Sequence, residues 1–105
     1  GHAVMFGLGG IFVEVYKDVA FRLSPMGRNV ARRMIKGIKG YPILKGLRGQ
    51  APSDIEAIEK NIVSLKAMVD NHPSIVELDI NPLFVHGEGE GTTVADIVIR
   101  IENEA

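Results

Sequence analysis

The sequence predicts an α+β fold with a mostly antiparallel sheet, and the order of its periodic segments carries this prediction. Strand-like runs come first, two amphipathic helical segments follow, and further strand-like runs come last. Elements that come in separate runs are typical of α+β domains, whereas regular alternation would indicate a parallel sheet. We therefore expect two main helices, near 26–37 and 54–70, packed on one face of the sheet.

Three short strands are expected in the N-terminal part. Residues 3–6 form an apolar run, and 11–16 and 19–23 are rich in β-branched and aromatic residues. A glycine-rich loop, 7–10, separates the first two runs. Lys17-Asp18 fits a two-residue hairpin turn between the last two, although it lacks the favoured glycine.

The two helices are expected from apolar residues at helical spacing. The first has Ser24 as its candidate cap and carries basic residues on its polar side. The second opens on a capping box, Ser53 followed by Glu56, and then repeats apolar residues at intervals of three and four. The stretch 40–52 between them contains glycine and proline and is expected to be an irregular link.

The C-terminal part is expected to form strands at 75–80, 83–85 and 94–101, interrupted by Asn81-Pro82 and by the glycine-rich loop 87–93. Because side chains alternate across a strand, each strand turns one apolar face to the helices. The predicted core consists of Ile55, Ile58, Ile62, Leu65, Val76, Leu78, Ile80, Ile97 and Ile99.

Length and composition describe one small globular domain or a part of one. The chain has 105 residues, of which 46% are hydrophobic and 24% charged, which argues against disorder. The longest uncharged run, Gly1–Val13, is too short to cross a bilayer, and we see no signal peptide. The absence of cysteine excludes disulfides and thiolate metal sites, and it fits a cytoplasmic location.

Charge is distributed unevenly along the chain. The net charge is −1, yet residues 19–53 hold eight basic residues and no acidic one. These are Arg22, Arg28, Arg32, Arg33, Lys36, Lys39, Lys45 and Arg48. Two interpretations stay open: a phosphate or polyanion bound near this segment, or an ordinary solvated helix face.

Acidic side chains gather on one predicted face of the C-terminal strands. If 75–80 and 94–101 pair antiparallel with their apolar faces toward the helices, a polar face is left uncovered. The polar residues on that face are Glu77, Asp79, Asn81 and Asp96. Carboxylates that face each other repel, and oxygen ligands of this kind suit Mg²⁺ shared with a nucleotide phosphate. The alternative is an ordinary solvent-exposed sheet face.

Weaker candidates lie near the N-terminus. Glu14 is expected on a mostly apolar face, where it needs a basic partner or access to water. The loop Gly7–Gly10 could bind phosphate through backbone N–H groups, but it lacks the spacing and the lysine of a P-loop. The histidines have no metal-ligand spacing, and we assign no catalytic histidine.

Three stretches together form a recognisable pattern. They are Val4–Leu23 without Tyr16 and Lys17, then Gly46-Leu47-Arg48-Gly49, and then Glu77–Leu83. The pattern resembles the ATP-grasp domain of ADP-forming acetyl-CoA (acyl-CoA) synthetases over essentially the whole chain. Succinyl-CoA synthetase β subunits are more distantly similar, through residues 80–83 and Asp96.

The resemblance implies a reaction, cofactors and partners. The family converts acyl-CoA, ADP and phosphate to acid, CoA and ATP through a phosphohistidine, with Mg²⁺ and ATP or ADP bound between two lobes. Residues 1–105 resemble only the second lobe, so we expect an inactive fragment whose partners are the first lobe and the CoA-binding and ligase domains or α subunit. Gly1-His2-Ala3 departs from the family pattern, and we expect it to be vector-derived. The acyl substrate and the choice between ADP and GDP stay open.

Site residues follow from the resemblance position by position. Asn81 and Asp96 match the magnesium ligands, and Asp79 matches the acidic position beside the metal and the incoming phosphohistidine. The resemblance implies catalytic roles for Asp79 and Arg48. Its implied contacts to nucleotide phosphates are Gly7, Gly9, Gly10, Glu14 and Arg22.

Other functions stay open at this point. The same module occurs fused to acetyltransferases as a non-catalytic ligand sensor. A nucleic-acid module could use the basic helix, but the acidic remainder and the 6% aromatic content argue against it. An isolated lobe exposes formerly covered surface, so we also expect self-association through residues 3–6 or 11–23.

Overall fold

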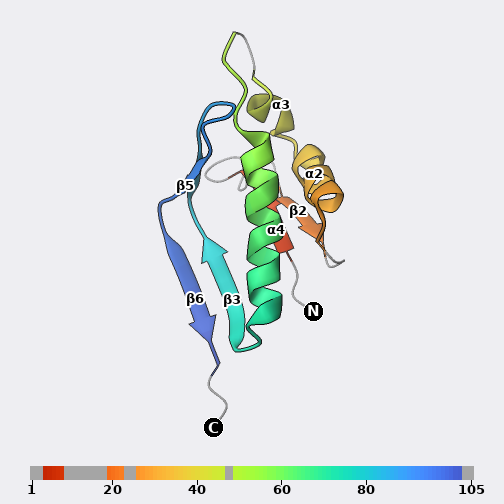
Figure 1. Cartoon of the computed structure of the whole chain (residues 1–105). Helices are drawn as coiled ribbons and strands as arrows, with labels where there is room; N and C mark the ends of the chain where they lie inside the picture. Colours follow the sequence, from red (N-terminus) through yellow and green to blue (C-terminus); the bar gives the residue numbers. More distant parts are fainter. Residues whose placement is uncertain (1–3, 9–18, 23–25, 47–48, 103–105) are drawn as a thin grey trace.

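The computed structural model describes residues 4–8, 19–22, 26–46 and 49–102. In chain order its elements are β1 (Val4–Gly7), β2 (Val19–Arg22), α2 (Arg28–Gly37), α3 (Tyr41–Leu44), α4 (Ile55–Asn71), β3 (Ile75–Ile80), β4 (Leu83–Val85), β5 (Thr92–Val94) and β6 (Ile97–Ile101) (Figure 1). This order confirms the predicted α+β class. None of the described helices is long and apolar enough to span a membrane.

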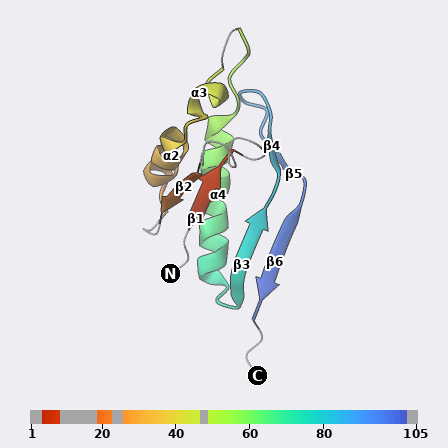
Figure 2. The ribbon, with the colours of Figure 1, turned by 180° about the vertical axis from the view of Figure 1, so that it is seen from behind.

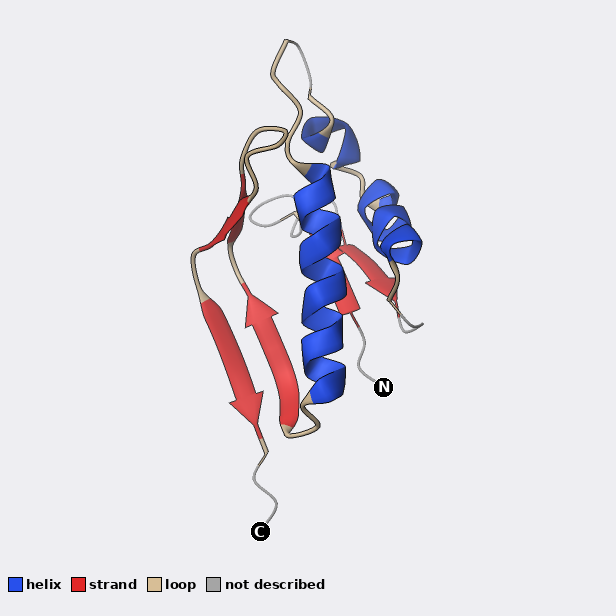
Figure 3. Cartoon of the chain, viewed as in Figure 1, coloured by secondary structure: helices blue, strands red, loops and turns tan. Residues whose placement is uncertain are grey.

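The described strands form antiparallel two-stranded ribbons: β1–β2, β3–β6 and β4–β5. Seen from behind, β1 lies in front of α4, whereas β3 and β6 run beside this helix with β3 the nearer strand (Figure 2). As predicted, both main helices pack against strands: α2 contacts β1 and β2, and α4 contacts β3 and β4. α4 is the long central helix (Figure 3). Within the described residues these ribbons take the place of the single sheet that we expected. The expected strand 11–16 and its turn lie outside them, and β2 pairs with β1.

The ribbons β3–β6 and β4–β5 are two halves of one long hairpin. Ile80 pairs with Ile97 in the first, and Leu83 pairs with Val94 in the second. The register is therefore the same on both sides, with two residues on each strand between the two ladders.

The interruption falls at Asn81-Pro82 and Ala95-Asp96, where we expected an unbroken strand 94–101. Pro82 has no N–H, so the regular ladder cannot continue through it. Instead Asn81 N–H donates to the Asp96 carbonyl at 3.2 Å, and Ala95 N–H donates to the Pro82 carbonyl at 3.1 Å. The two strands stay together here without forming a ladder.

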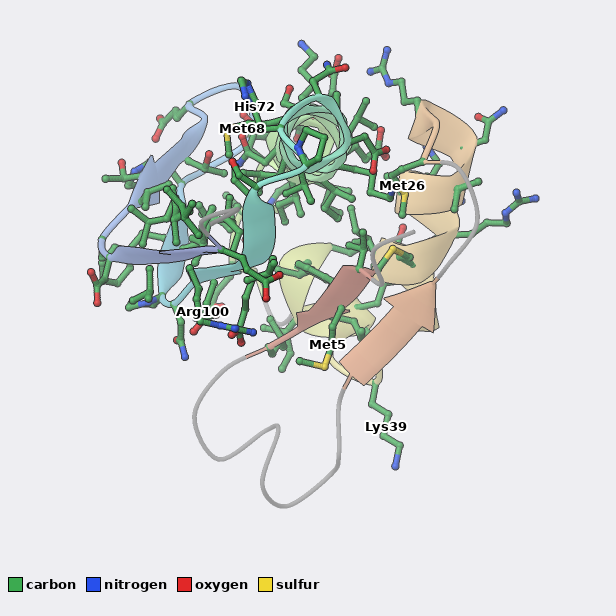
Figure 4. All side chains as sticks on the ribbon, turned by 90° about the horizontal axis from the view of Figure 1, so that it is seen from below. Met5, Met26, Lys39, Met68, His72 and Arg100 are labelled. Carbon is green, nitrogen blue, oxygen red and sulfur yellow. The ribbon has the colours of Figure 1, made fainter. Side chains whose placement is uncertain are left out.

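The buried core lies mainly between the helices. Its members are Ala31, Met34, Ile35, Ile38, Leu44, Ile58 and Ile62. Of the other predicted core residues, those on α4 and β3 are half-buried: Ile55, Leu65, Val76, Leu78 and Ile80. Ile97 and Ile99 are each 43% exposed, so their placement in the core is wrong. The reason is that β3 lies between α4 and β6, and α4 covers only the nearer strand (Figure 4).

Helix starts differ in detail from the prediction. α2 begins at Arg28 with Gly27 as its N-cap, later than expected, and no side chain caps it. The N-cap of α4 is Asp54 rather than Ser53, because the Asp54 carboxylate accepts the Ala57 N–H at 3.1 Å. Ser53 forms a backbone bridge to the hairpin loop. The single turn α3 lies in the stretch that we expected to be irregular.

Ion pairs join α2 to α4. The Glu59 side chain is only 4% exposed and accepts from Arg32 Nε at 2.9 Å and from Arg28 Nε at 3.4 Å. Arg28 also donates to the exposed Glu56 at 2.7 Å. The hydrogen bond to Glu59 and its negative charge raise the pKa of Arg32. Two members of the basic segment therefore have partners inside the molecule.

Candidate functional site

The break in the long hairpin brings together the three residues predicted to hold a metal. Asn81 lies opposite Asp96, and residues in such positions have Cβ atoms about 4.5–5.5 Å apart. Asp79 pairs with Val98, which makes it a diagonal neighbour of Asp96 at about 7–8 Å. All three side chains are exposed. No described element covers them, so a ligand could reach them from solvent.

The local charge comes from Asp79 and Asp96. Within the described part of the chain neither carboxylate takes part in an ion pair or a side-chain hydrogen bond. Glu77 lies on the same face, but its negative charge is compensated by Arg100, whose Nε donates to the Glu77 carboxylate at 3.1 Å across the strands. In Figure 4 Arg100 projects away from α4, which marks this face as the one opposite the helices.

The donor set fits Mg²⁺. The described residues contain no cluster of three or more acidic or histidine side chains that could hold a metal without help. The site offers two carboxylates and one amide oxygen, and Mg²⁺ commonly binds one or two carboxylates together with phosphate oxygens and waters. The arrangement therefore suits a metal that a phosphorylated ligand brings with it.

Removing the two clustered acids should stabilise the metal-free chain slightly. We expect Asp79→Asn with Asp96→Asn to raise Tm by about 1–2 °C, because diagonal like charges cost only a few tenths of a kcal/mol. Thermal unfolding in EDTA measures this. A lower Tm in the double variant would show that these carboxylates stabilise the metal-free fold, which contradicts the expected repulsion between them.

The β4–β5 hairpin, which adjoins this site, is joined by hydrogen bonds to the N-terminal half of α4 and its N-cap. The Asp54 carboxylate accepts the Gly91 N–H at 2.7 Å in addition to that of Ala57, and these N–H groups lower the pKa of Asp54. Asn61 donates to the Thr92 hydroxyl at 2.6 Å. The role of Asp54 as N-cap was not predicted, although an aspartate directly after Ser53 is as good a cap as serine.

Asp54 should make stability depend on pH in the acidic range. Its folded pKa lies below the unfolded value of about 4, so its contribution is complete above pH 4 and disappears as pH falls through the folded pKa. We expect Asp54→Asn to lower Tm by several degrees at pH 7 and by much less at pH 3. The control Glu88→Gln, at an exposed residue of the same loop, should change Tm little at either pH. An equal loss at both pH values would contradict this assignment.

Two other predicted site residues, Gly7 and Arg22, lie on the β1–β2 ribbon and not on the long hairpin. Gly7 faces Val19 at one end of the β1–β2 ribbon, and Arg22 faces Val4 at the other, about 10 Å away along the strands. β1 and β3 run in the same direction, so Gly7 lies toward the Asn81 end (Figure 2). The structure does not bring Gly7 and Arg22 together. The remaining predicted residues lie outside the described part: Gly9, Gly10, Glu14 and Arg48.

In the Gly46–Gly49 motif, the backbone conformation explains why glycine stands at position 46. Gly46 has a φ of +94°, and a Cβ there would lie 2.5 Å from the Gln50 carbonyl oxygen. Only glycine fits this turn without strain. Close by, an open hollow of about 860 Å³ lies around the start of α4 and the loop 88–91. None of the predicted site residues lines this hollow, and Asn81 and Asp96 are exposed outside it.

The described part of the chain combines an antiparallel α+β architecture with exposed oxygen donors at the break in the long hairpin. The chain matches the ATP-grasp domain family over residues 1–101 and belongs to that family. It is 53% identical over 103 residues to the β subunit of an ADP-forming acetate–CoA ligase II from Pyrococcus furiosus. That match covers 97% of this chain and 44% of the relative.

Solved structures agree with this assignment. A crystal structure of a protein from Pyrococcus horikoshii matches with a TM-score of 0.90 and 48% identity, over 99% of this chain and 44% of that one. An acetyl-coenzyme A synthetase of Ca. Korarchaeum cryptofilum matches with a TM-score of 0.86 and 40% identity, over 95% of this chain and 46% of that one. It was solved with coenzyme A and Mg-AMPPCP, its phosphohistidine segment pointing towards the nucleotide-binding site. The chain spans less than half the length of these relatives.

Proposed function

We propose that this chain is the second lobe of the ATP-grasp domain of an ADP-forming acyl-CoA ligase, where it binds the magnesium-nucleotide. The observation that carries the proposal is the position of Asn81 opposite Asp96, with Asp79 beside them, in a segment 53% identical to such a β subunit. The reaction is acyl-CoA + ADP + phosphate to acid + CoA + ATP, by way of a phosphohistidine elsewhere in the parent enzyme.

The proposed chemistry is electrostatic. The Asn81 amide oxygen and the Asp96 carboxylate would hold Mg²⁺, with Asp79 beside it. When bound, the metal neutralises charge on the phosphate oxygens during phosphoryl transfer. Asp79 and Asp96 supply the negative charge that retains a divalent cation, and their exposure leaves room for phosphate and water ligands. The proposed phosphate contacts are Arg48 and the glycines Gly7, Gly9 and Gly10. Glu14 and Arg22 are proposed to bind the nucleotide as well, with no contact assigned to either.

The lobe is proposed to need partners for activity. Since Asn81 and Asp96 are exposed, the first lobe would have to cover the nucleotide. The CoA-binding and ligase domains, or an α subunit, would supply the phosphohistidine and the thioester chemistry. A cytoplasmic location, where these substrates occur, is part of the same proposal.

A turnover assay of the parent enzyme tests the function. With acetyl-CoA, ADP, phosphate and Mg²⁺ we expect ATP to form, and with this chain alone we expect none. An intact parent that binds acyl-CoA without turning over any of a panel of acyl-CoA substrates would favour the ligand-sensing alternative. Calorimetry should also show much weaker Mg-ATP binding by this chain than by the parent, and equal affinity would contradict the need for a first lobe.

A further inference from the structure

β6 is unusually exposed for an aliphatic strand. Each of its residues is exposed, including Val98 at 60% and Ile101 at 59%. Arg100 is its only charged residue. On its inner edge β6 pairs with β3, and no described strand pairs with its outer edge.

The apolar residues of β6 occupy both faces of the ribbon. Ile97 and Ile99 pair with Ile80 and Leu78, and so they share the side of α4. Val98 pairs with Asp79 on the opposite side. Natural edge strands are usually protected by charges, proline, bulges or a covering element. Apolar residues on both faces are instead typical of a strand buried inside a sheet.

We propose that β6 is an internal strand in the complete enzyme, and that its outer edge pairs with a β-strand from the rest of the ligase β subunit. The chain aligns over 97% of its own length with the Pyrococcus furiosus β subunit and spans only 44% of that subunit, so more than half of such a subunit is available as the occupant. The inference rests on the proposed placement of this chain in a longer ligase and not on the metal ligands.

Charge around β6 favours such a strand over a second copy of this chain. A two-fold antiparallel pairing that engages the whole of β6 is centred on Ile99. It would place Asp96 of one copy opposite Glu102 of the other at both ends, and like charges directly opposite are destabilising. The occupant that fits best is an aliphatic strand with lysine or arginine at its ends.

Hydrogen exchange measured by mass spectrometry tests the pairing. We expect amides of 97–101 to exchange at least about tenfold more slowly in the full-length β subunit than in the 105-residue chain. Amides of α4 serve as the control for an intact fold in both. Equal exchange of β6 in the two proteins would overturn the proposal. So would protection that appears on concentrating the 105-residue chain alone, because the occupant would then be a second copy.

A pair of variants at one position makes the test independent of activity. Val98→Lys should leave the Tm of the 105-residue chain nearly unchanged, because the side chain is exposed there. In the full-length subunit, Val98→Lys should abolish most of the slowing of amide hydrogen exchange in β6 relative to the 105-residue chain. Val98→Thr keeps the β-branched shape and should keep that protection. If Val98→Lys leaves the added protection of the full-length subunit intact, Val98 is not buried there, and the interpretation of β6 as a buried internal strand is wrong. Protection of β6 in a parent enzyme that is complete with all its domains or subunits and still shows no turnover would support the pairing while contradicting the proposed function.

Discussion

Replacing Asn81 or Asp96 by alanine in the complete enzyme should lower turnover by about a hundredfold or more while the fold survives. Both side chains are exposed at the hairpin break, so truncation removes little buried surface. The strands at this point are held by backbone hydrogen bonds between Asn81, Asp96, Pro82 and Ala95, which alanine retains. Loss of a group that holds charge against the reacting phosphate typically costs this much in rate.

Turnover measured at saturating Mg²⁺ and nucleotide tests the loss of activity, and Tm tests whether the fold survives. Glu88→Gln is the matched control, since it removes an exposed acid from the same hairpin outside the site. We expect it to keep most of the activity. Full activity of the Asn81→Ala enzyme under these conditions would end the metal-ligand assignment. Lost activity with a greatly lowered Tm would show a structural role instead.

Glu59→Ala should be the most destabilising change among the charged residues of the helices. Its carboxylate is buried and accepts hydrogen bonds from Arg28 and Arg32, which join α4 to α2. Hydrogen bonds to charged groups contribute about 1.5–3 kcal/mol, so we expect a loss of about 2 kcal/mol. For a domain of this size that corresponds to a fall in Tm of about 10 °C.

Glu56→Ala is a close control. Glu56 lies one turn earlier on the same helix and pairs with the same Arg28 at 2.7 Å, but its side chain is 61% exposed. Exposed pairs contribute at most about 1 kcal/mol, so the Tm should change by a few degrees at most. Chemical denaturation with equal m-values would give the two free energies directly. Equal losses would show that burial of Glu59 is not what gives this pair its strength.

Much of the candidate site could be predicted because strand alternation is local. Asp79 and Asn81 are two residues apart, so an extended backbone places them on one face whatever the rest of the chain does. The loop between the two C-terminal strands is of hairpin length, which predicts the antiparallel pairing that places Asp96 opposite Asn81. The interruption of the ladder could also have been expected, because Pro82 cannot donate to it.

Asp54 and Glu59 escaped the sequence analysis for a different reason. Asp54 joins α4 to the hairpin because the loop places the Gly91 N–H, from 37 residues away in the chain, within hydrogen-bond distance of its carboxylate. Glu59 reads as a polar residue on an exposed helix face until Arg32 of α2 packs against it, 27 residues away. No local pattern specifies such partners.

The sequence by itself determined the order of the described elements, the antiparallel pairing of the C-terminal hairpin and the polar face that carries Asp79, Asn81 and Asp96. These features depend on periodicity and on turn residues, which act over a few positions. Only the tertiary structure decided which apolar faces are covered. Ile97 and Ile99 have the alternation of core residues, yet they are exposed because α4 reaches across β3 and no further. Burial depends on what packs against a strand, and the described part of this chain leaves the residues of β6 exposed.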